Sequence, residues 1–217
     1  MLFFQFLLNP NCVISKTKKT YFTGLLLDFV LLLLLNLIIG VTSSFFALRL
    51  GFDFGFKRSI QYTSEHAILI IFLGPIIEEF TFRAPLKISY LSLLLFSIGV
   101  YKIMENSTPK YYSLSMVIIV VAVIWCKYRS LRIIVTKNIN LLVYISSIIF
   151  GLLHLSNLSF EKLTFPVFLL YSFPIIFAGL TYAYIRMKYN LFLAILLHSL
   201  YNSLPFLFVF LGVIDRP

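Results

Sequence analysis

The sequence predicts an all-α membrane protein, a single bundle of about seven transmembrane helices with six to eight as the range. Of its 217 residues, 60% are hydrophobic and only 12% are charged. Soluble domains are nearer to half apolar and a quarter charged. The mean hydropathy of +0.98 agrees with this difference. Composition therefore excludes an ordinary soluble domain.

Seven apolar segments approach the length of about 20 residues that spans a bilayer. The first follows a short arm, residues 1–20, and lacks a small-x-small cleavage site, so we expect a retained helix rather than a signal peptide. The second and third are nearly continuous and break near Pro85, and residues 21–217 are predicted to form one membrane domain. The segments run roughly over residues 21–48, 65–86, 87–103, 111–127, 139–157, 164–186 and 190–212.

The distribution of Lys and Arg predicts a cytoplasmic N-terminus. In that orientation eleven basic residues lie on the cytoplasmic side and seven outside, and the run "KYRSLRIIVTK" at residues 127–137 contributes most to the bias. The composition, rich in Ile, Lys, Asn and Phe, favours a bacterial cell membrane. The net charge of +10 does not indicate nucleic acid, because the basic residues lie between apolar runs. Cys12 and Cys126 have no ligand spacing and are expected to be free thiols.

Few polar groups lie within the apolar runs. A charge at membrane depth costs at least a few kcal/mol, so such residues usually pair, face the bundle interior and carry function. Asp28 and Asn36 are eight residues apart, share a helix face and are expected to form interhelical hydrogen bonds. His66, beside Glu65, is expected at the membrane interface. The remaining groups are Glu78, Glu79, Arg83, His154, His198 and Asn202.

The stretch "GPIIEEFTFRAPL", residues 74–86, places Glu79 and Arg83 four residues apart, so they can pair on one helix face. A purely structural ion pair is the alternative interpretation of these two residues. Glu78 is turned about 100° away and lacks that partner. An unpaired carboxylate in an apolar site is a candidate general base.

Two other helices offer polar faces with the same spacing. Phe150 and His154 are four residues apart, as are His198 and Asn202. A carboxylate and a histidine can hold and deprotonate water, and a second histidine with an amide can stabilise an oxyanion. The serines near these residues have no adjacent base at helical spacing, and neither cysteine lies near them in the sequence, so the pattern favours hydrolysis by activated water.

The motifs EExxxR in "EEFTFR", FxxxH in "FGLLH" and HxxxN in "HSLYN" resemble, in order and separation, the CAAX prenyl protease and bacteriocin-processing (CPBP, Abi) family of intramembrane endopeptidases. The resemblance covers about residues 65–205. It implies a helical membrane bundle that hydrolyses a peptide bond, with Glu78 as the base, His154 holding the water, and His198 and Asn202 stabilising the oxyanion. Glu79, Arg83 and Phe150 would be supporting residues.

The sequence allows alternatives for both the cofactor and the class of function. Glu78, His154 and His198 could form a zinc set. The absence of an HExxH spacing and the poor ligand character of Asn202 favour metal-free hydrolysis. Intramembrane Glu, His and Asn also line ion paths, so a small proton-coupled transporter is one alternative. A non-catalytic peptide-binding protein of bacteriocin immunity is another. The expected partners are membrane lipid and a peptide or membrane-protein substrate, with no nucleic acid.

Overall fold

The computed structural model describes residues 2–12, 22–52, 67–105, 118–119, 121–122, 126–158 and 163–210. Within these ranges the chain is helical, which confirms the predicted all-α class. The π-helix η1 (Leu69–Leu73) and the 3-10 helices η2 (Ala84–Leu86) and η3 (His154–Asn157) are short. The α-helices are α1 (Leu2–Leu8), α3 (Phe22–Arg49), α5 (Gly74–Phe82), α6 (Tyr90–Glu105), α8 (Tyr128–Lys137), α9 (Ile139–Leu153), α10 (Phe165–Lys188) and α11 (Leu191–Phe210).

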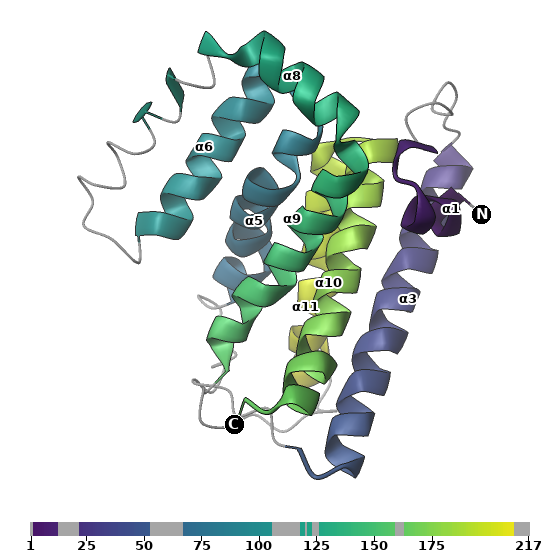
Figure 1. Cartoon of the computed structure of the whole chain (residues 1–217). Coiled ribbons are helices and arrows are strands. Elements are labelled where there is room, and N and C mark those ends of the chain that lie inside the picture. The colour runs from purple at the N-terminus through teal and green to yellow at the C-terminus, as the bar shows by residue number, and fades with distance from the viewer. Residues whose placement is uncertain are drawn as a thin grey trace.

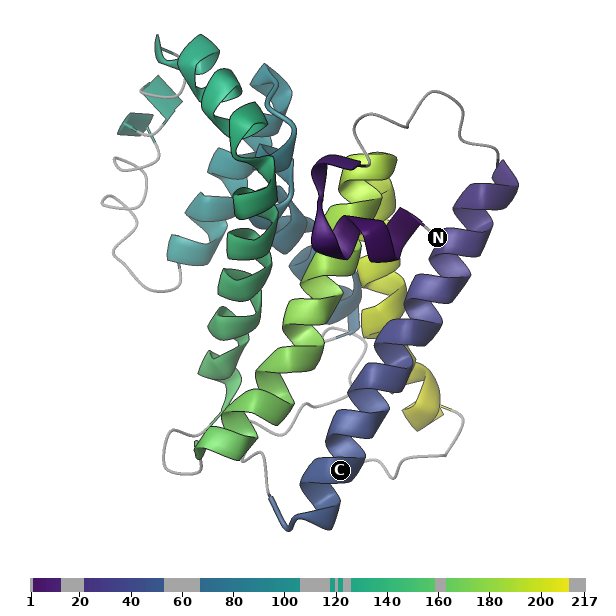
Figure 2. The ribbon, with the colours of Figure 1, turned by 45° about the vertical axis from the view of Figure 1, so that its right-hand side comes forward.

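Helix α10 is the centre of the bundle and packs against α9, α3 and α11 (Figures 1 and 2). Helix α5 packs between α6 and α11. Helix α8 lies across the end of the bundle at which α9 begins. Three described helical segments are long and apolar enough to cross a membrane, namely 23–49, 139–157 and 165–188, while 90–104 and 191–207 are apolar but shorter.

The second predicted span, roughly 65–86, is helical without interruption over residues 67–82, with the π-helix η1 inside this run. The segment changes from the π-helix η1 to α5 at Gly74, whose N–H bonds to the carbonyl of Leu69. It then ends in the 3-10 turn η2, which contains Pro85. The predicted break before the third span is confirmed there. Most of the fourth predicted span, and His66, lie outside the described residues.

Polar side chains of α3 join it to α10, as expected of interhelical hydrogen bonds. Asn36 donates to the hydroxyl of Thr181 across 2.9 Å. The Asp28 carboxylate accepts hydrogen bonds from Tyr184, Lys188 and Tyr189. Because one carboxylate satisfies three donors from the end of α10, the first long helix is fixed to the centre of the bundle.

The first residues form a packed helix that the sequence analysis does not anticipate. In α1, Phe3 and Phe6 are buried. Their rings meet the ring of Tyr184 at centroid distances of 5.2 and 5.3 Å. Seven residues are too short to span a bilayer, so this helix owes its place to aromatic burial against α10. Cys12 and Cys126 do not form a disulfide bond, which agrees with the expectation from their spacing.

Candidate active site

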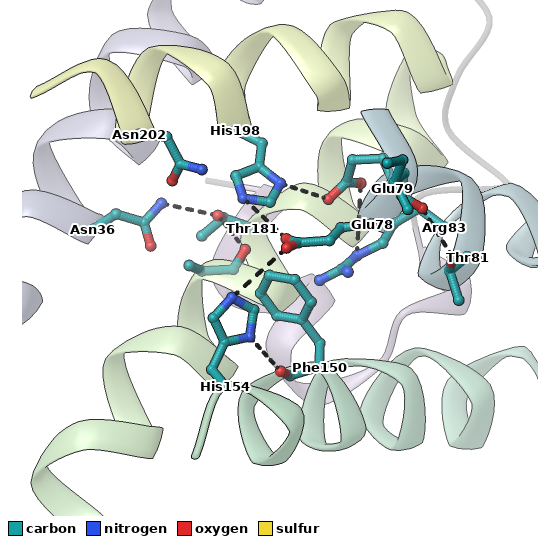
Figure 3. Close-up of polar contacts among 12 residues, drawn as sticks. Asn36, Glu78, Glu79, Thr81, Arg83, Phe150, His154, Thr181, His198 and Asn202 are labelled. Carbon is teal, nitrogen blue, oxygen red and sulfur yellow. Dashed lines mark hydrogen bonds and ion pairs between the residues drawn. The ribbon is translucent and has the colours of Figure 1, made fainter. Parts of the chain in front are cut away.

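Three helical segments place side chains around the Glu78 carboxylate (Figure 3). His154 Nε2 lies 4.0 Å from Glu78 Oε1, and His198 Nε2 lies 3.5 Å from Glu78 Oε2. Glu78 comes from α5, His154 from the turn after α9, and His198 from α11. Residues separated by up to 120 positions in sequence therefore meet at one carboxylate.

Exposure divides this cluster into an open side and a closed side. The side chains of Glu78 and His154 are 28% and 26% exposed, whereas His198 is 3% exposed and Glu79 is fully buried. The gap between Glu78 and His154 is therefore open at the surface of the bundle. The opposite side, formed by His198 and Glu79, is enclosed.

The Nδ1 atom of His154 lies 2.8 Å from the carbonyl oxygen of Phe150, one turn earlier. A carbonyl only accepts, so this ring nitrogen carries the proton and donates. In a neutral ring Nε2 is then the lone-pair atom, and it is the atom that faces Glu78. The local spacing of FxxxH thus fixes both the orientation and the tautomer of His154.

The enclosed side joins Glu79 to two partners. Its Oε1 accepts a hydrogen bond from His198 Nδ1 across 3.1 Å. Its Oε2 lies 3.7 Å from Arg83 Nε, and both of these side chains are fully buried. The pair predicted from the i, i+4 spacing is confirmed. The bond to His198 is new, because only the packing of α5 against α11 reveals it.

Arg83 occupies an unusual position for a guanidinium. Within the described part of the chain none of its three side-chain nitrogens has a hydrogen-bond partner. Its charged group instead lies 4.2 Å from the ring centroid of Phe150, a cation–π arrangement. A Cβ at Gly179 would lie only 2.8 Å from Arg83 Nη2, so the glycine on α10 leaves the space that this group fills.

Aromatic rings hold the two histidines. Phe150 is 2% exposed, and its ring centroid lies 4.6 Å from that of His154 and 5.7 Å from that of His198. Tyr182 stacks on His198 with centroids 4.4 Å apart and an interplanar angle of 16°. Tyr182 was not singled out from the sequence, because it belongs to no motif. Its role depends on which face of α10 meets α11.

Asn202 lies one turn after His198 on α11, and its side-chain N–H donates to the carbonyl oxygen of Ile70 across 3.0 Å. In a π turn that carbonyl would receive the N–H of residue 75, which is proline and has none. Asn202 therefore satisfies a carbonyl that Pro75 leaves free. Its second N–H remains available, so Asn202 is not committed wholly to the site predicted for it.

The structure thus brings together six of the predicted residues, namely Glu78, Glu79, Arg83, Phe150, His154 and His198. It holds Asn202 at the edge of this cluster, on the same side of His198 as Asn36 (Figure 3). In the described ranges no three His, Cys, Asp or Glu side chains form a set that could hold a metal ion.

Comparison with known proteins places the chain in a family. Residues 62–204, about two thirds of the chain, match the family model described as type II CAAX prenyl endopeptidase Rce1-like. The match covers every residue of the cluster from Glu78 to Asn202 and leaves out α1 and α3. No curated protein and no solved structure matches the chain. With its apolar spans, the chain is an integral membrane protein that belongs to the Rce1-like family of type II CAAX prenyl endopeptidases.

Proposed function

We propose that the protein is an intramembrane endopeptidase that hydrolyses a peptide bond with water activated by Glu78. The observation that carries the proposal is the position of this carboxylate between the Nε2 atoms of His154 and His198, at 4.0 and 3.5 Å. Membership of an endopeptidase family supports the reaction class. The assignment of roles below rests on geometry and chemistry.

The 4.0 Å separation between Glu78 and His154 suits a bridging water. The carboxylate oxygen and the lone pair of Nε2 are both acceptors, so they cannot bond to each other. A water between them can donate one hydrogen to each. Its oxygen is then oriented with lone pairs free to attack, on the side of the cluster where Glu78 and His154 are partly exposed.

The reaction follows from this arrangement. The water oxygen adds to the peptide carbonyl carbon while Glu78 accepts the proton. The oxyanion that forms would receive hydrogen bonds from His198 Nε2, when protonated, and from the second N–H of Asn202. Glu78 then returns the proton to the leaving nitrogen as the C–N bond breaks, which yields a carboxylic acid and an amine.

The remaining residues would keep the open and the enclosed side of the site in a fixed position relative to one another. Glu79 fixes His198 through Nδ1. Arg83 balances the charge of Glu79 and packs on Phe150. The cluster contains two carboxylates, Glu78 and Glu79, and one guanidinium, so a positive charge on His198 during the reaction would make it neutral. Glu79, Arg83 and Phe150 are accordingly positioning residues.

The substrate class is taken from the family description. We propose as the first probe a peptide with a C-terminal Cys-aliphatic-aliphatic-X sequence whose cysteine carries an isoprenyl thioether. The purified protein in lipid nanodiscs is incubated with this peptide, with the same peptide lacking the isoprenoid, and with an apolar transmembrane peptide. Mass spectrometry then identifies any cleaved bond.

The wild-type protein is expected to cleave at least one of the three peptides, and Glu78→Gln is expected to abolish cleavage because glutamine cannot accept the proton. Cleavage that survives in Glu78→Gln would overturn the proposed base. Proton-coupled flux in liposomes without cleavage of any peptide would favour the transporter alternative. Protection against a bacteriocin that persists in both Glu78→Gln and His198→Ala would favour a non-catalytic immunity role.

A further inference from the structure

Helix α8 carries a surface that the catalytic cluster does not use. Arg129, Ile133 and Lys137 are four residues apart and therefore share one face, and Arg132 lies beside them. All four side chains are exposed, and Ile133 is 58% exposed. We call these four residues the α8 patch.

The opposite face of α8 attaches to the bundle. Val135 packs against the hydrophobic core. At the start of the helix the ring of Tyr128 stacks on Tyr90 of α6, with centroids 4.2 Å apart. At its end, Asn138 alone separates α8 from α9. The orientation of the α8 patch is therefore fixed by contacts at both ends and on the inner face.

The position of α8 sets its depth in the membrane. It ends at Lys137, two residues before Ile139, where an apolar segment able to cross the membrane begins. Burying three cations in the hydrocarbon would be very unfavourable. Placing the helix wholly in water would leave Ile133 and Ile134, which are 58% and 53% exposed, in contact with solvent. The boundary between headgroups and acyl chains satisfies both requirements.

No ion pair of the described residues neutralises the charges of the α8 patch. Helix α8 contains no acidic residue. Among the ion pairs of the described residues, none involves Arg129, Arg132 or Lys137. Two guanidinium groups three residues apart on one helix provide the planar donors that bind phosphate oxygens. The neighbouring Ile133 can enter the acyl region beneath them.

We propose that the α8 patch is a binding site for the headgroups of anionic phospholipids. Arg129 and Arg132 bind the phosphodiester, Lys137 adds to the local positive potential, and Ile133 inserts among the upper acyl carbons. In the expected orientation this end of the bundle is cytoplasmic, where the membrane surface is negatively charged. The inference is independent of the hydrolytic reaction.

The test measures which lipids lie next to α8. A fluorophore is attached at position 136 through Thr136→Cys, in a background of Cys12→Ser and Cys126→Ser. Thr136 is chosen because it is exposed and lies one turn after Arg132 on the same side of the helix. The protein is reconstituted into vesicles of phosphatidylcholine and phosphatidylglycerol, of which one or the other is brominated. Bromine on the upper acyl carbons quenches a nearby fluorophore.

Brominated phosphatidylglycerol is expected to quench more strongly than brominated phosphatidylcholine, and the preference should fall with added salt. In Arg129→Gln/Arg132→Gln it should fall by up to about thirty-fold, since each cation at an anionic surface contributes about fivefold. The control is Arg49→Gln, which removes an exposed cation from the last residue of α3 and should leave the preference unchanged. That end of α3 lies at the opposite end of the bundle from α8 (Figure 1).

Equal quenching by the two lipids, or a preference that survives in the double variant, would overturn the proposal. So would an absence of quenching, because α8 would then lie outside the membrane surface. A preference lost equally in Arg49→Gln would show that overall charge is responsible and not the α8 patch. Loss of the preference on addition of inorganic phosphate at constant ionic strength would assign the patch to free phosphate and not to lipid.

Discussion

His198 donates its Nδ1–H to the buried Oε1 of Glu79 across 3.1 Å, so the second glutamate of the EExxxR motif holds the histidine of the HxxxN motif. The first glutamate, Glu78, faces the other nitrogen of the same ring at 3.5 Å. Adjacent residues of one helix thus contact opposite sides of one imidazole. This explains how two neighbouring carboxylates can have different roles: one is enclosed and paired, and the other is partly open.

Glu79→Gln is expected to destabilise the protein by about 3–5 kcal/mol, because it leaves the buried Arg83 charge without its carboxylate. Cleavage of the probe peptide should also be lost, since His198 loses its charged partner. Thermal unfolding in nanodiscs and the cleavage assay measure the two effects. In Glu79→Gln/Arg83→Met most of the stability should return without the activity. If Glu79→Gln were as stable as the wild type, the assignment of Glu79 as the charge partner of Arg83 would be contradicted.

Gly179→Ala is expected to displace the Arg83 guanidinium, because the added methyl would lie 2.8 Å from Nη2. Misplacement of Glu79 and then of His198 should lower kcat by about a hundredfold, with less effect on KM. Arg83→Lys lacks Nη2, so Gly179→Ala should lower kcat far less in that background. The matched glycine substitution is Gly24→Ala, where a methyl meets nothing within 4 Å.

If Gly179→Ala lowered kcat equally in the wild-type and Arg83→Lys backgrounds, the effect would arise from a contact other than that with Arg83. The added methyl would also lie 3.2 Å from the backbone of Ser147 on α9. A loss of kcat that arises from this contact reflects the spacing of α9 and α10 and does not depend on the side chain at position 83. The double-mutant cycle separates these two causes.

Asn202→Ala is expected to have two separable effects. It leaves the carbonyl of Ile70 without its donor, at a cost of about 1–3 kcal/mol in stability. It also removes a proposed oxyanion donor, at a cost of about a hundredfold to a thousandfold in kcat. Pro75→Ala restores a backbone N–H in register with that carbonyl. The variant Asn202→Ala/Pro75→Ala should therefore regain stability and remain inactive.

Recovery of activity in Asn202→Ala/Pro75→Ala would show that Asn202 acts only through the backbone of η1. Asn202 would then have a structural role and no direct part in the reaction. Unfolding temperature and kcat, measured on the same preparations, distinguish the two outcomes.

Removal of metal ions is expected to leave cleavage unchanged. The proposed reaction uses Glu78 and the two histidines without a metal, and these residues do not form a metal-binding set in the described ranges. The measurement is cleavage after dialysis against a chelator, together with elemental analysis of the purified protein. Stoichiometric zinc, with activity lost on chelation and restored by zinc, would contradict the proposal.

Much of the site could be predicted from spacing within single helices. The i, i+4 rule gave the Glu79–Arg83 pair, the approach of the Phe150 and His154 rings and the shared face of His198 and Asn202. Each of these relationships is fixed by helix geometry alone. The apolar runs similarly predicted the helices, because a backbone in lipid must satisfy its own hydrogen bonds.

Contacts between helices could not be predicted in the same way. Nothing in the local sequence states that His198 bonds to Glu79, that Tyr182 stacks on His198 or that Gly179 makes room for Arg83. These contacts depend on the rotation and spacing of packed helices. The burial of Phe3 and Phe6 in α1 depends in the same way on an aromatic partner, Tyr184, more than 170 positions away.

The sequence by itself thus determined that the chain is a helical membrane protein and which residues are candidates for its chemistry, because hydropathy and helical periodicity are local properties. Tertiary structure alone decided that Glu78 lies between two imidazoles and that Asn202 serves the carbonyl left free by Pro75. Those relationships join separate helices, and their geometry is set by close packing of side chains across the bundle.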